Sequence, residues 1–203
     1  MIQLNDKHYI GEGEIRFCYE HPKNKALCIK IPRPETTIEY TNKELLYFKK
    51  LSKRNKNKYG YSFYSDFYNE VETNMGKGQV FDLIRDETTG EISKTLEFYL
   101  NNTSKISDEE LDAALKKLKK QMINNKIFTR DLRARNICCK LNKNDSIAFV
   151  IIDGIGHRDF FPLADWFHFF SIKKVDRTFT KWGFDSIREQ RDFLKKEENK
   201  TFS

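Results

Sequence analysis

The sequence predicts an α+β fold with a strand-rich N-terminal part and a more helical C-terminal part. In the first 85 residues, apolar runs separated by turn residues indicate strands at 8–19, 25–31, 62–73 and 78–85. A long helical repeat of apolar residues begins after Ser107. Two short apolar runs, at 137–140 and 148–152, then predict a second pair of strands.

The predicted N-terminal strands are joined by short turns. Residues 8–19 and 25–31 are expected to form an antiparallel pair around a turn at 21–24, and 76–78 is the expected turn between the other two strands. Apolar residues at 45, 48 and 51 predict a helix over about 37–52. The basic stretch 53–58 is expected to be a solvated loop, and 86–90 to connect the two parts of the chain.

The C-terminal part is predicted to be mainly helical. A short helix is expected near 96–100, and Ser107 is expected to cap a longer one with Glu110 as its capping-box partner. The longer helix has one apolar face, formed by Leu111, Ala114, Leu115, Leu118, Met122 and Ile123. Aromatic residues from 160 to 182 predict further helix, and the charged residues 185–203 are expected to fray.

Composition favours one soluble domain. The chain has 203 residues, of which 38% are hydrophobic and 14% aromatic, enough to bury a core. No apolar run approaches the roughly 20 residues that span a bilayer. The first residues also lack the apolar core of a signal peptide, so we expect a cytoplasmic protein. The four cysteines show no C-x-x-C spacing and no clustering with the histidines, so we expect reduced thiols and no zinc site.

The most informative motif is T-R-D-L-R-A-R-N at residues 129–136, followed after a short apolar run by Asp153. Asp131 stands five residues before Asn136, with Arg133 between them. This spacing is similar to the protein-kinase catalytic loop H-R-D-x-K-x-x-N, and Asp153 stands where the aspartate of D-F-G would be expected. In such a centre one carboxylate orients the attacking hydroxyl, while an amide oxygen and a second carboxylate hold Mg²⁺ against the nucleotide phosphates. The order of these residues predicts a phosphoryl-transfer site.

Upstream segments resemble the other parts of a protein kinase, in the same order. Residues 11–18, G-E-G-E-I-R-F-C, resemble the Gly-rich phosphate loop, with Arg16 in place of the third glycine. The run L-C-I-K at 27–30 resembles the third strand, which ends here in Lys30. Glu44 is the expected ion-pair partner of Lys30, and Glu39 is the alternative.

This resemblance implies a site for ATP and Mg²⁺. Asp131 would orient the acceptor hydroxyl, Arg133 would stabilise the migrating phosphoryl charge and Lys30 would hold the α- and β-phosphates. Asn136 and Asp153 would hold the metal. The other nucleotide-binding positions that the resemblance implies are Gly11, Gly13, Cys18, Cys28, Glu44 and Cys138, the three cysteines lining the adenine pocket.

The chain also departs from ordinary protein kinases. Thr129 replaces the usual histidine, D-F-G lacks its phenylalanine, and no A-P-E follows. Together with V-F-D-L-I-R-D at 80–86 and I-I-D-G-I-G at 151–156, the whole chain resembles the YrbL family of the PhoP regulatory network, a group of small bacterial kinase-like proteins. The resemblance implies a protein-kinase-like bilobal fold with a truncated C-terminal lobe: an N-lobe over about 1–86 and a reduced helical C-lobe over about 87–203.

Three hypotheses of function follow. We expect an ATP-binding, kinase-like phosphotransferase whose acceptor is a hydroxyl of a small-molecule or envelope-related compound, rather than a folded protein. The alternative is a pseudokinase that acts as a nucleotide-gated regulatory or scaffold protein. Taken singly, each motif residue also has an ordinary structural explanation, such as a turn at Asp131 or a strand lysine whose stem packs at Lys30.

The third hypothesis is nonspecific binding of nucleic acid or of an anionic surface. Basic residues outnumber acidic ones by 37 to 30. One stretch interleaves basic and aromatic residues, namely Tyr47, Lys49, Lys50, Lys53, Arg54, Lys56, Lys58, Tyr59 and Tyr61. We do not expect nucleic acid to be the main partner, because the chain has no RNP, KH or helix-turn-helix signature.

Overall fold

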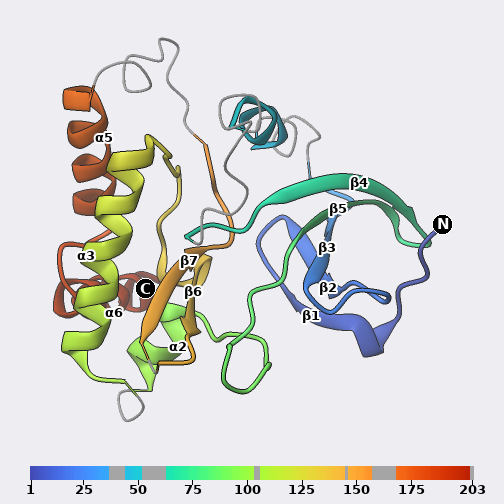
Figure 1. Ribbon diagram of the computed structural model, residues 1–203, viewed down its shortest axis with the longest axis horizontal. Coiled ribbons are helices and arrows are strands. Elements are labelled where there is room, and N and C mark those ends of the chain that lie inside the picture. Colours follow the sequence, from blue (N-terminus) through green and yellow to red (C-terminus); the bar gives the residue numbers. More distant parts are fainter. Residues whose placement is uncertain (37–43, 52–62, 103–105, 145, 157–167, 202–203) are drawn as a thin grey trace. The chain divides into compact units, whose positions relative to one another are not determined.

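The chain folds into two compact units, Met1–Arg85 and Asp86–Ser203. The structure, a computed structural model, describes residues 1–36, 44–51, 63–102, 106–144, 146–156 and 168–201. Within these residues, unit 1 contains a five-stranded antiparallel sheet, and unit 2 contains a two-stranded hairpin and four α-helices (Figure 1). The predicted mixed α+β class with an antiparallel sheet is confirmed.

The sheet of unit 1 has the strand order β1-β2-β3-β5-β4. Its strands are β1 Tyr9–Glu12, β2 Arg16–Glu20, β3 Leu27–Pro32, β4 Phe67–Thr73 and β5 Gly76–Asp82. The antiparallel pairing of β2 with β3 and of β4 with β5 agrees with the predicted pairs. The central strand β3 lies between β2 and β5, so its residues are held on both sides.

Two predicted boundaries in this sheet are wrong. Residues 8–19 do not form one strand, because the backbone N–H of Gly13 donates to the carbonyl of Arg16 at 2.8 Å and closes a hairpin between β1 and β2. The turn between β4 and β5 is Asn74–Met75 instead of 76–78, and Gly76 and Gly78 already belong to β5. Glycine spacing indicated a turn nearby but not its register.

The two faces of this sheet are covered differently. One face carries an apolar cluster formed by Leu4, Tyr19, Ile29, Ile31 and Val80. On the other face, Phe81 packs edge-on against Phe48 of a helix over residues 44–51, with ring centroids 5.6 Å apart. The predicted helix over 37–52 is thus confirmed for its described part, while 37–43 and the expected loop at 53–58 lie outside the described residues.

Unit 2 is organised around its longest helix. Its helices are α2 Leu96–Asn101, α3 Asp108–Asn125, α5 His168–Lys181 and α6 Ile187–Thr201, and its strands are β6 Ile137–Leu141 and β7 Ile147–Ile151. The predicted capping box of α3 is confirmed: Glu110 donates its N–H to Ser107 Oγ, and its carboxylate accepts from the Ser107 N–H at 3.0 Å. The predicted apolar face of α3 packs against β7 and α5 (Figure 1).

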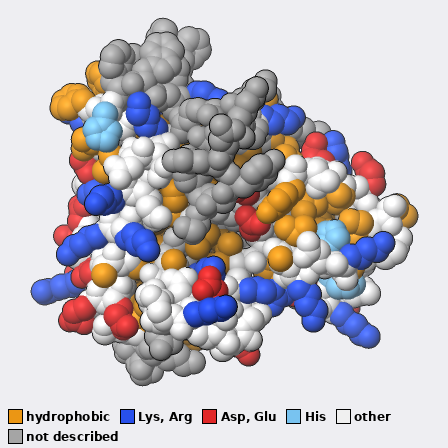
Figure 2. All heavy atoms as spheres, in the orientation of Figure 1, with side chains coloured by type: hydrophobic (Ala, Val, Ile, Leu, Met, Phe, Trp, Pro, Cys, Tyr) orange, Lys and Arg blue, Asp and Glu red, His pale blue; other side chains and the backbone are white. Residues whose placement is uncertain are grey.

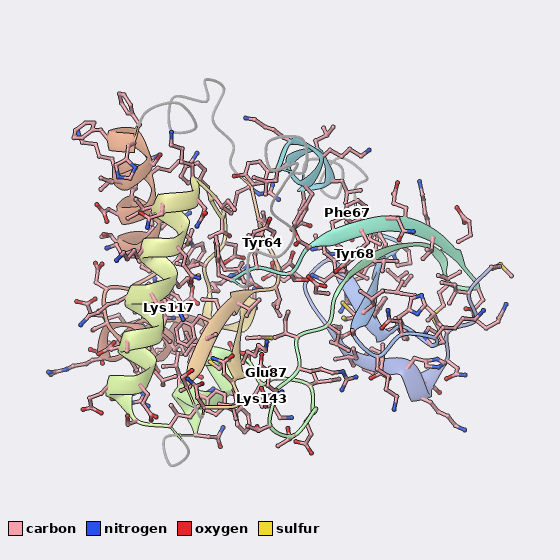
Figure 3. All side chains as sticks on the ribbon, viewed as in Figure 1. Tyr64, Phe67, Tyr68, Glu87, Lys117 and Lys143 are labelled. Atoms are coloured by element: carbon pink, nitrogen blue, oxygen red, sulfur yellow. The ribbon has the colours of Figure 1, made fainter. Side chains whose placement is uncertain are left out.

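The β6–β7 hairpin is fixed to the start of unit 2. The N–H of Glu87 donates to the Leu141 carbonyl at 2.8 Å, and its carboxylate accepts from Lys140 Nζ at 2.7 Å and from the backbone N–H of Lys143 at 3.3 Å (Figure 3). The hydrogen bonds from Lys140 and Lys143 lower the pKa of Glu87. These contacts hold the far end of the hairpin.

The C-terminal residues differ from expectation. Residues 187–201 form the helix α6, where fraying was predicted from charge alone. Its inward side buries Ile187 and Gln190, and Arg191 Nη1 donates to both carboxylate oxygens of Asp108, at 2.8 and 2.7 Å. The aromatic segment is helical from His168 onward, and 157–167 lies outside the described residues. None of the described helices has the length and apolarity needed to cross a membrane.

Candidate functional site

The β6–β7 hairpin brings two of the predicted metal ligands to the same end. Asn136 ends a 3-10 turn that leads directly into β6, and Asp153 is the second residue after the end of β7. The hairpin pairs Ile137 with Ile151, and the ladder is extended by the Ile152 N–H, which donates to the Asn136 carbonyl at 2.8 Å. The antiparallel register therefore determines that Asn136 and Asp153 are neighbours.

The 129–136 loop is tied to the segment that follows β7. The Arg130 N–H donates to the Gly154 carbonyl at 2.8 Å, and Thr129 Oγ1 donates to the same carbonyl at 2.8 Å. Thr129 Oγ1 also accepts from the Asp131 N–H at 3.2 Å. The Thr129 hydroxyl, standing where the kinase loop has histidine, thus links the two halves of the site.

Gly154 is required at its position. Its φ of +76° lies in the left-handed region, and a Cβ would lie 3.1 Å from Asp131 Cβ and 3.2 Å from the Asp131 carbonyl. The glycine therefore allows Asp131 and Asp153 to approach each other through their backbones. The structure brings Asp131, Arg133, Asn136 and Asp153 into one cluster of unit 2, all partly exposed.

Arg133 holds the carboxylate of Asp131. Its Nε donates to both carboxylate oxygens, each at 2.9 Å, and its Nη2 also donates to Oδ2. The backbone N–H of Arg133 donates to Oδ1 at 3.1 Å. Because a guanidinium is planar, these bonds fix the orientation of the carboxylate as well as its position.

The donors of this cluster suit a magnesium ion. Asn136 and Asp153 offer amide and carboxylate oxygens, the hard ligands that Mg²⁺ prefers, and Mg²⁺ usually takes only one or two carboxylates from the protein. Among the described residues, no group of three His, Cys, Asp or Glu side chains could hold a metal by itself. A site of this kind would therefore need oxygens from water and from a phosphate ligand to complete its coordination.

In unit 1, a group of buried polar residues lies on the face of the sheet covered by the helix over 44–51. Cys18 pairs with Lys30, and Lys30 pairs with Gln79, so the three side chains lie side by side on adjacent strands. Lys30 is 8% exposed, and its Nζ lies 4.5 Å from the ring centroid of Phe81. Arg16, two residues before Cys18, lies on the same face and is 4% exposed.

Glu44 forms its ion pair with Arg16, whereas Lys30 was the expected partner. Arg16 Nη1 donates to Glu44 Oε2 at 2.8 Å and to Gln79 Oε1 at 3.1 Å, and both charged side chains are about 95% buried. Glu39, the alternative partner, lies outside the described residues. The residue at the position of the third glycine thus takes part in the buried polar group, next to Lys30.

The Gly-rich hairpin is held in place from the segment after β3. Arg33 Nη2 pairs with Glu12 at 2.8 Å, and Arg33 Nε donates to the Gly13 carbonyl at 3.2 Å. A Cβ on Gly11 would meet no described atom within 4 Å, and one on Gly13 would lie 3.8 Å from a carbonyl. The residues that the structure describes leave this space open, which is the condition for a ligand to approach the backbone closely.

The cysteines are placed as reduced thiols. Cys18 and Cys28 share the face of Lys30, and a hydrogen bond with Cys18, together with burial, raises the pKa of Cys28 well above its usual range. Burial likewise raises the pKa of Cys139. Cys138 lies buried in unit 2, where its Sγ is 3.7 Å from the Ser93 carbonyl. Thiols with raised pKa values react slowly.

Two contacts of the site were not predicted. The first is the Arg16–Glu44–Gln79 group, for which a signal existed: Arg16 shares the two-residue alternation of Cys18 and therefore the same sheet face. The second is Trp182, whose ring centroid lies 5.6 Å from the guanidinium carbon of Arg133. No local pattern connects these two residues, because they are 49 positions apart and meet only in the folded unit.

Comparison with known proteins shows the family to which this chain belongs. The family described as PhoP regulatory network protein YrbL matches residues 2–183, a range that includes every site residue named above. Two relatives, each titled "Uncharacterized protein YrbL", come from Escherichia coli (strain K12) and Shigella flexneri. Each is 32% identical over 185 residues, covering 90% of this chain and 86% of the relative. The chain therefore belongs to the YrbL family of PhoP regulatory network proteins.

Proposed function

We propose that this protein is an ATP-dependent, Mg²⁺-requiring phosphotransferase with a protein-kinase-like bilobal fold and a reduced C-terminal lobe. Its acceptor would be a hydroxyl of a small-molecule or envelope-related compound. The observation that carries the proposal is the cluster in unit 2, where the β6–β7 hairpin and Gly154 bring Asp131, Asn136 and Asp153 together. An orienting carboxylate beside two oxygen donors for Mg²⁺ is the set of groups that phosphoryl transfer needs.

Unit 1 supports the same proposal independently. It combines an antiparallel sheet, a helix on one face and a lysine on the central strand β3. Lys30 lies beside the buried Arg16–Glu44 pair. The space above Gly11 and Gly13 would let a phosphate group approach the backbone of this hairpin closely. A positive, buried group close to such a hairpin favours a polyanionic ligand.

The roles of the residues follow from their chemistry. Mg²⁺-ATP, when bound, supplies the phosphoryl group together with a metal that neutralises part of its charge. Lys30 would hold the phosphates, while Asn136 and Asp153 would hold the metal. Asp131 would accept a hydrogen bond from the acceptor hydroxyl and orient it for attack. Arg133, held against Asp131, would stabilise negative charge that develops beside that carboxylate.

One observation favours the pseudokinase hypothesis as the second candidate. Arg133 already donates to both oxygens of Asp131, so an incoming hydroxyl must share an occupied carboxylate. A protein that binds nucleotide without transferring phosphate would keep this arrangement. The two candidates agree on nucleotide binding and differ on the role of Asp131.

The first prediction concerns the metal. Asp153→Asn should weaken Mg²⁺-dependent ATP binding by at least about tenfold, because one anionic ligand of the cation is lost next to the phosphates. Isothermal titration calorimetry with and without Mg²⁺ measures the change. The matched control is Asp192→Asn, which neutralises an exposed aspartate of α6 and should leave ATP binding unchanged.

Equal affinity of wild type and Asp153→Asn for ATP, with and without Mg²⁺, would remove the metal assignment. A comparable loss of ATP affinity in Asp192→Asn would mean that ATP binding depends on the net charge of the protein and not on the carboxylate at position 153.

The second prediction separates enzyme from scaffold. Asp131→Asn should lower phosphotransfer by about a hundredfold or more and leave ATP affinity nearly unchanged, because an orienting carboxylate acts mainly in the transition state. Turnover is measured as ATP consumption with a library of hydroxylated metabolites and with water as the only acceptor. If wild type shows no turnover with any acceptor but still binds Mg²⁺-ATP, the pseudokinase candidate is correct.

A further inference from the structure

Arg133 is held from two sides, by Asp131 and by Trp182. Its guanidinium donates through Nε to both carboxylate oxygens of Asp131 at 2.9 Å, and its carbon lies 5.6 Å from the Trp182 ring centroid. Guanidinium groups bind the faces of tryptophan rings through cation–π attraction, which strengthens when the contact is partly shielded from water. Arg133 is only 25% exposed, so this shielding exists here.

The position of Trp182 is determined by the end of α5. Gly183, with a φ of +64°, turns the chain out of the helix, and the Phe184 N–H donates back to the Phe179 carbonyl at 2.9 Å. The rings of Phe179 and Phe184 also pack, with centroids 6.1 Å apart. This combination is a Schellman motif with its hydrophobic contact, and it fixes Trp182 as the capping residue directly after α5 ends at Lys181.

The helix α6 supports the same indole from another side. Phe193 lies edge-on to Trp182 with ring centroids 6.2 Å apart, and a Cβ on Gly183 would lie 3.1 Å from Phe193 Cβ. The position of the indole is thus fixed by contacts other than its contact with Arg133. The helices α5 and α6 begin more than thirty residues after the 129–136 loop. Trp182, which lies between these helices in sequence, therefore connects them to that loop through Arg133.

We propose that Trp182 is a positioning residue: it holds the Arg133 guanidinium and, through it, the orientation of the Asp131 carboxylate. The catalytic part of this inference rests on the proposed phosphotransfer, while the structural part does not. Without the indole, the guanidinium loses one of the contacts that hold it, and its hydrogen bonds to the Asp131 carboxylate should open more often. The α5–α6 pair thereby controls the geometry of the loop that would orient the acceptor.

The test reads the contact directly by NMR, without nucleotide. The Nε–H of Arg133, hydrogen-bonded to Asp131, should give a slowly exchanging signal, assigned by its absence in Arg133→Lys. Trp182→Leu should speed its exchange about fivefold, the order expected for loss of one cation–π contact. Trp182→Phe, which keeps an aromatic face, should stay closer to wild type. The matched control Phe169→Leu removes another cation–π contact of α5, with Lys173 at 4.3 Å, and should leave the Arg133 signal unchanged.

A second measurement keeps the shape of the Trp182 side chain. It therefore remains informative even if the shorter side chain in Trp182→Leu prevents folding. In a Trp166→Phe background, fluorinated tryptophan at position 182 weakens the negative face of the ring with almost no change in volume. Exchange of the Arg133 Nε–H should rise stepwise with the number of fluorine atoms. If the exchange rate of the Arg133 Nε–H changes neither with fluorination nor in Trp182→Leu, the proposal is overturned.

Kinetics then separate this inference from the proposed function. Trp182→Leu should lower kcat about tenfold with little change in the KM for ATP, and Trp182→Phe should restore most of it. A KM effect without a kcat effect would overturn the positioning role. If the NMR signal responds as expected but wild type neither binds ATP nor transfers phosphate, the proposed function fails and Trp182 is shown to position the loop for structural reasons alone.

Discussion

At the scale of single residues, the buried ion pair of Arg16 and Glu44 has the greatest expected effect on stability. Both side chains are about 95% buried, and Gln79 adds a hydrogen bond at 3.1 Å. Removing one partner of such a pair leaves an uncompensated charge in a poorly hydrated site, whereas replacing both by apolar side chains removes the desolvation cost too. The pair therefore adds little net stability compared with two apolar side chains, but replacing only one of its two residues should be strongly destabilising.

The third prediction follows from this asymmetry. Arg16→Met should lower the free energy of unfolding by about 3–5 kcal/mol, and the double variant Arg16→Met/Glu44→Leu should recover most of the loss. Urea denaturation followed by circular dichroism measures both. The control is Arg85→Met, which breaks an ion pair with Glu20 whose side chains are 24% and 27% exposed, and it should cost about 1 kcal/mol or less. Equal losses in Arg16→Met and Arg85→Met would contradict the expectation.

Residue types were easier to predict than residue partners. Asp131, Asn136 and Asp153 could be chosen from order and spacing. The structure places them together because the β6–β7 hairpin, which lies between Asn136 and Asp153 in the sequence, returns the chain to its starting point. The partner of Glu44 could not be chosen in this way. Lys30 and Arg16 lie on the same sheet face, and which cation reaches the carboxylate depends on the placement of the helix over 44–51.

At the scale of elements, the ends of helices were predictable when their caps are local. The Ser107–Glu110 capping box lies within four residues and fixes the start of α3. Charge alone misled at α6, because its helicity depends on the burial of Ile187 and on the Arg191–Asp108 contact with α3, which no local pattern contains. The β1–β2 hairpin was missed although its closing contact is local: the Gly13 N–H donates to the Arg16 carbonyl three residues later, inside the stretch predicted as one strand.

Two acidic residues with different roles, Asp66 and Asp82, lie where β4 begins and β5 ends, opposite the turn of this hairpin. Asp82 accepts hydrogen bonds from the Tyr68 hydroxyl at 2.6 Å and from the Asp66 N–H at 2.9 Å. The bond to Asp82 raises the pKa of Tyr68. Asp66 is partly buried, and burial raises its pKa; a hydrogen bond with Tyr64 opposes this shift, and the nearby Asp82 charge adds a smaller increase.

The fourth prediction is a pH dependence of stability caused by Asp66. An aspartate whose pKa is raised in the folded state favours folding while it is protonated, and this contribution is lost as pH rises from the unfolded value of about 4 through the folded pKa. Asp66→Asn should therefore be as stable as wild type near pH 3 and more stable at pH 7. Thermal or urea unfolding at several pH values measures the difference.

The comparison variant for this prediction is Asp82→Asn. It replaces one of the two carboxylate oxygens, each of which accepts one hydrogen bond, by an NH2 group, and should destabilise the protein at pH 7 by about 1 kcal/mol. An Asp66→Asn variant whose stability relative to wild type is the same at pH 3 and pH 7 would show that the ionised Asp66 carboxylate carries no cost in the folded protein.

At the scale of the whole molecule, the net charge of +7 and the pI of about 9.1 are the properties that bear on polyanion binding. The predicted basic patch is not supported where it is described: Lys49 and Lys50 are exposed, but Tyr47 is 7% exposed and cannot stack on a base. Residues 52–62 of that stretch lie outside the described residues. On the face shown in Figure 2, Lys and Arg side chains are interspersed with Asp, Glu and uncharged groups.

The fifth prediction is that any nucleic-acid binding is electrostatic and unspecific. Affinity for two unrelated double-stranded DNA sequences should be equal at 50 mM salt and fall about tenfold or more by 200 mM, because binding through phosphates releases counterions. Fluorescence anisotropy of labelled DNA measures this, and Asp153→Asn should bind DNA at least as well as wild type, since it removes one negative charge. Preference for one sequence, or affinity that survives 200 mM salt, would instead require a dedicated nucleic-acid site and would move the third hypothesis ahead of phosphotransfer.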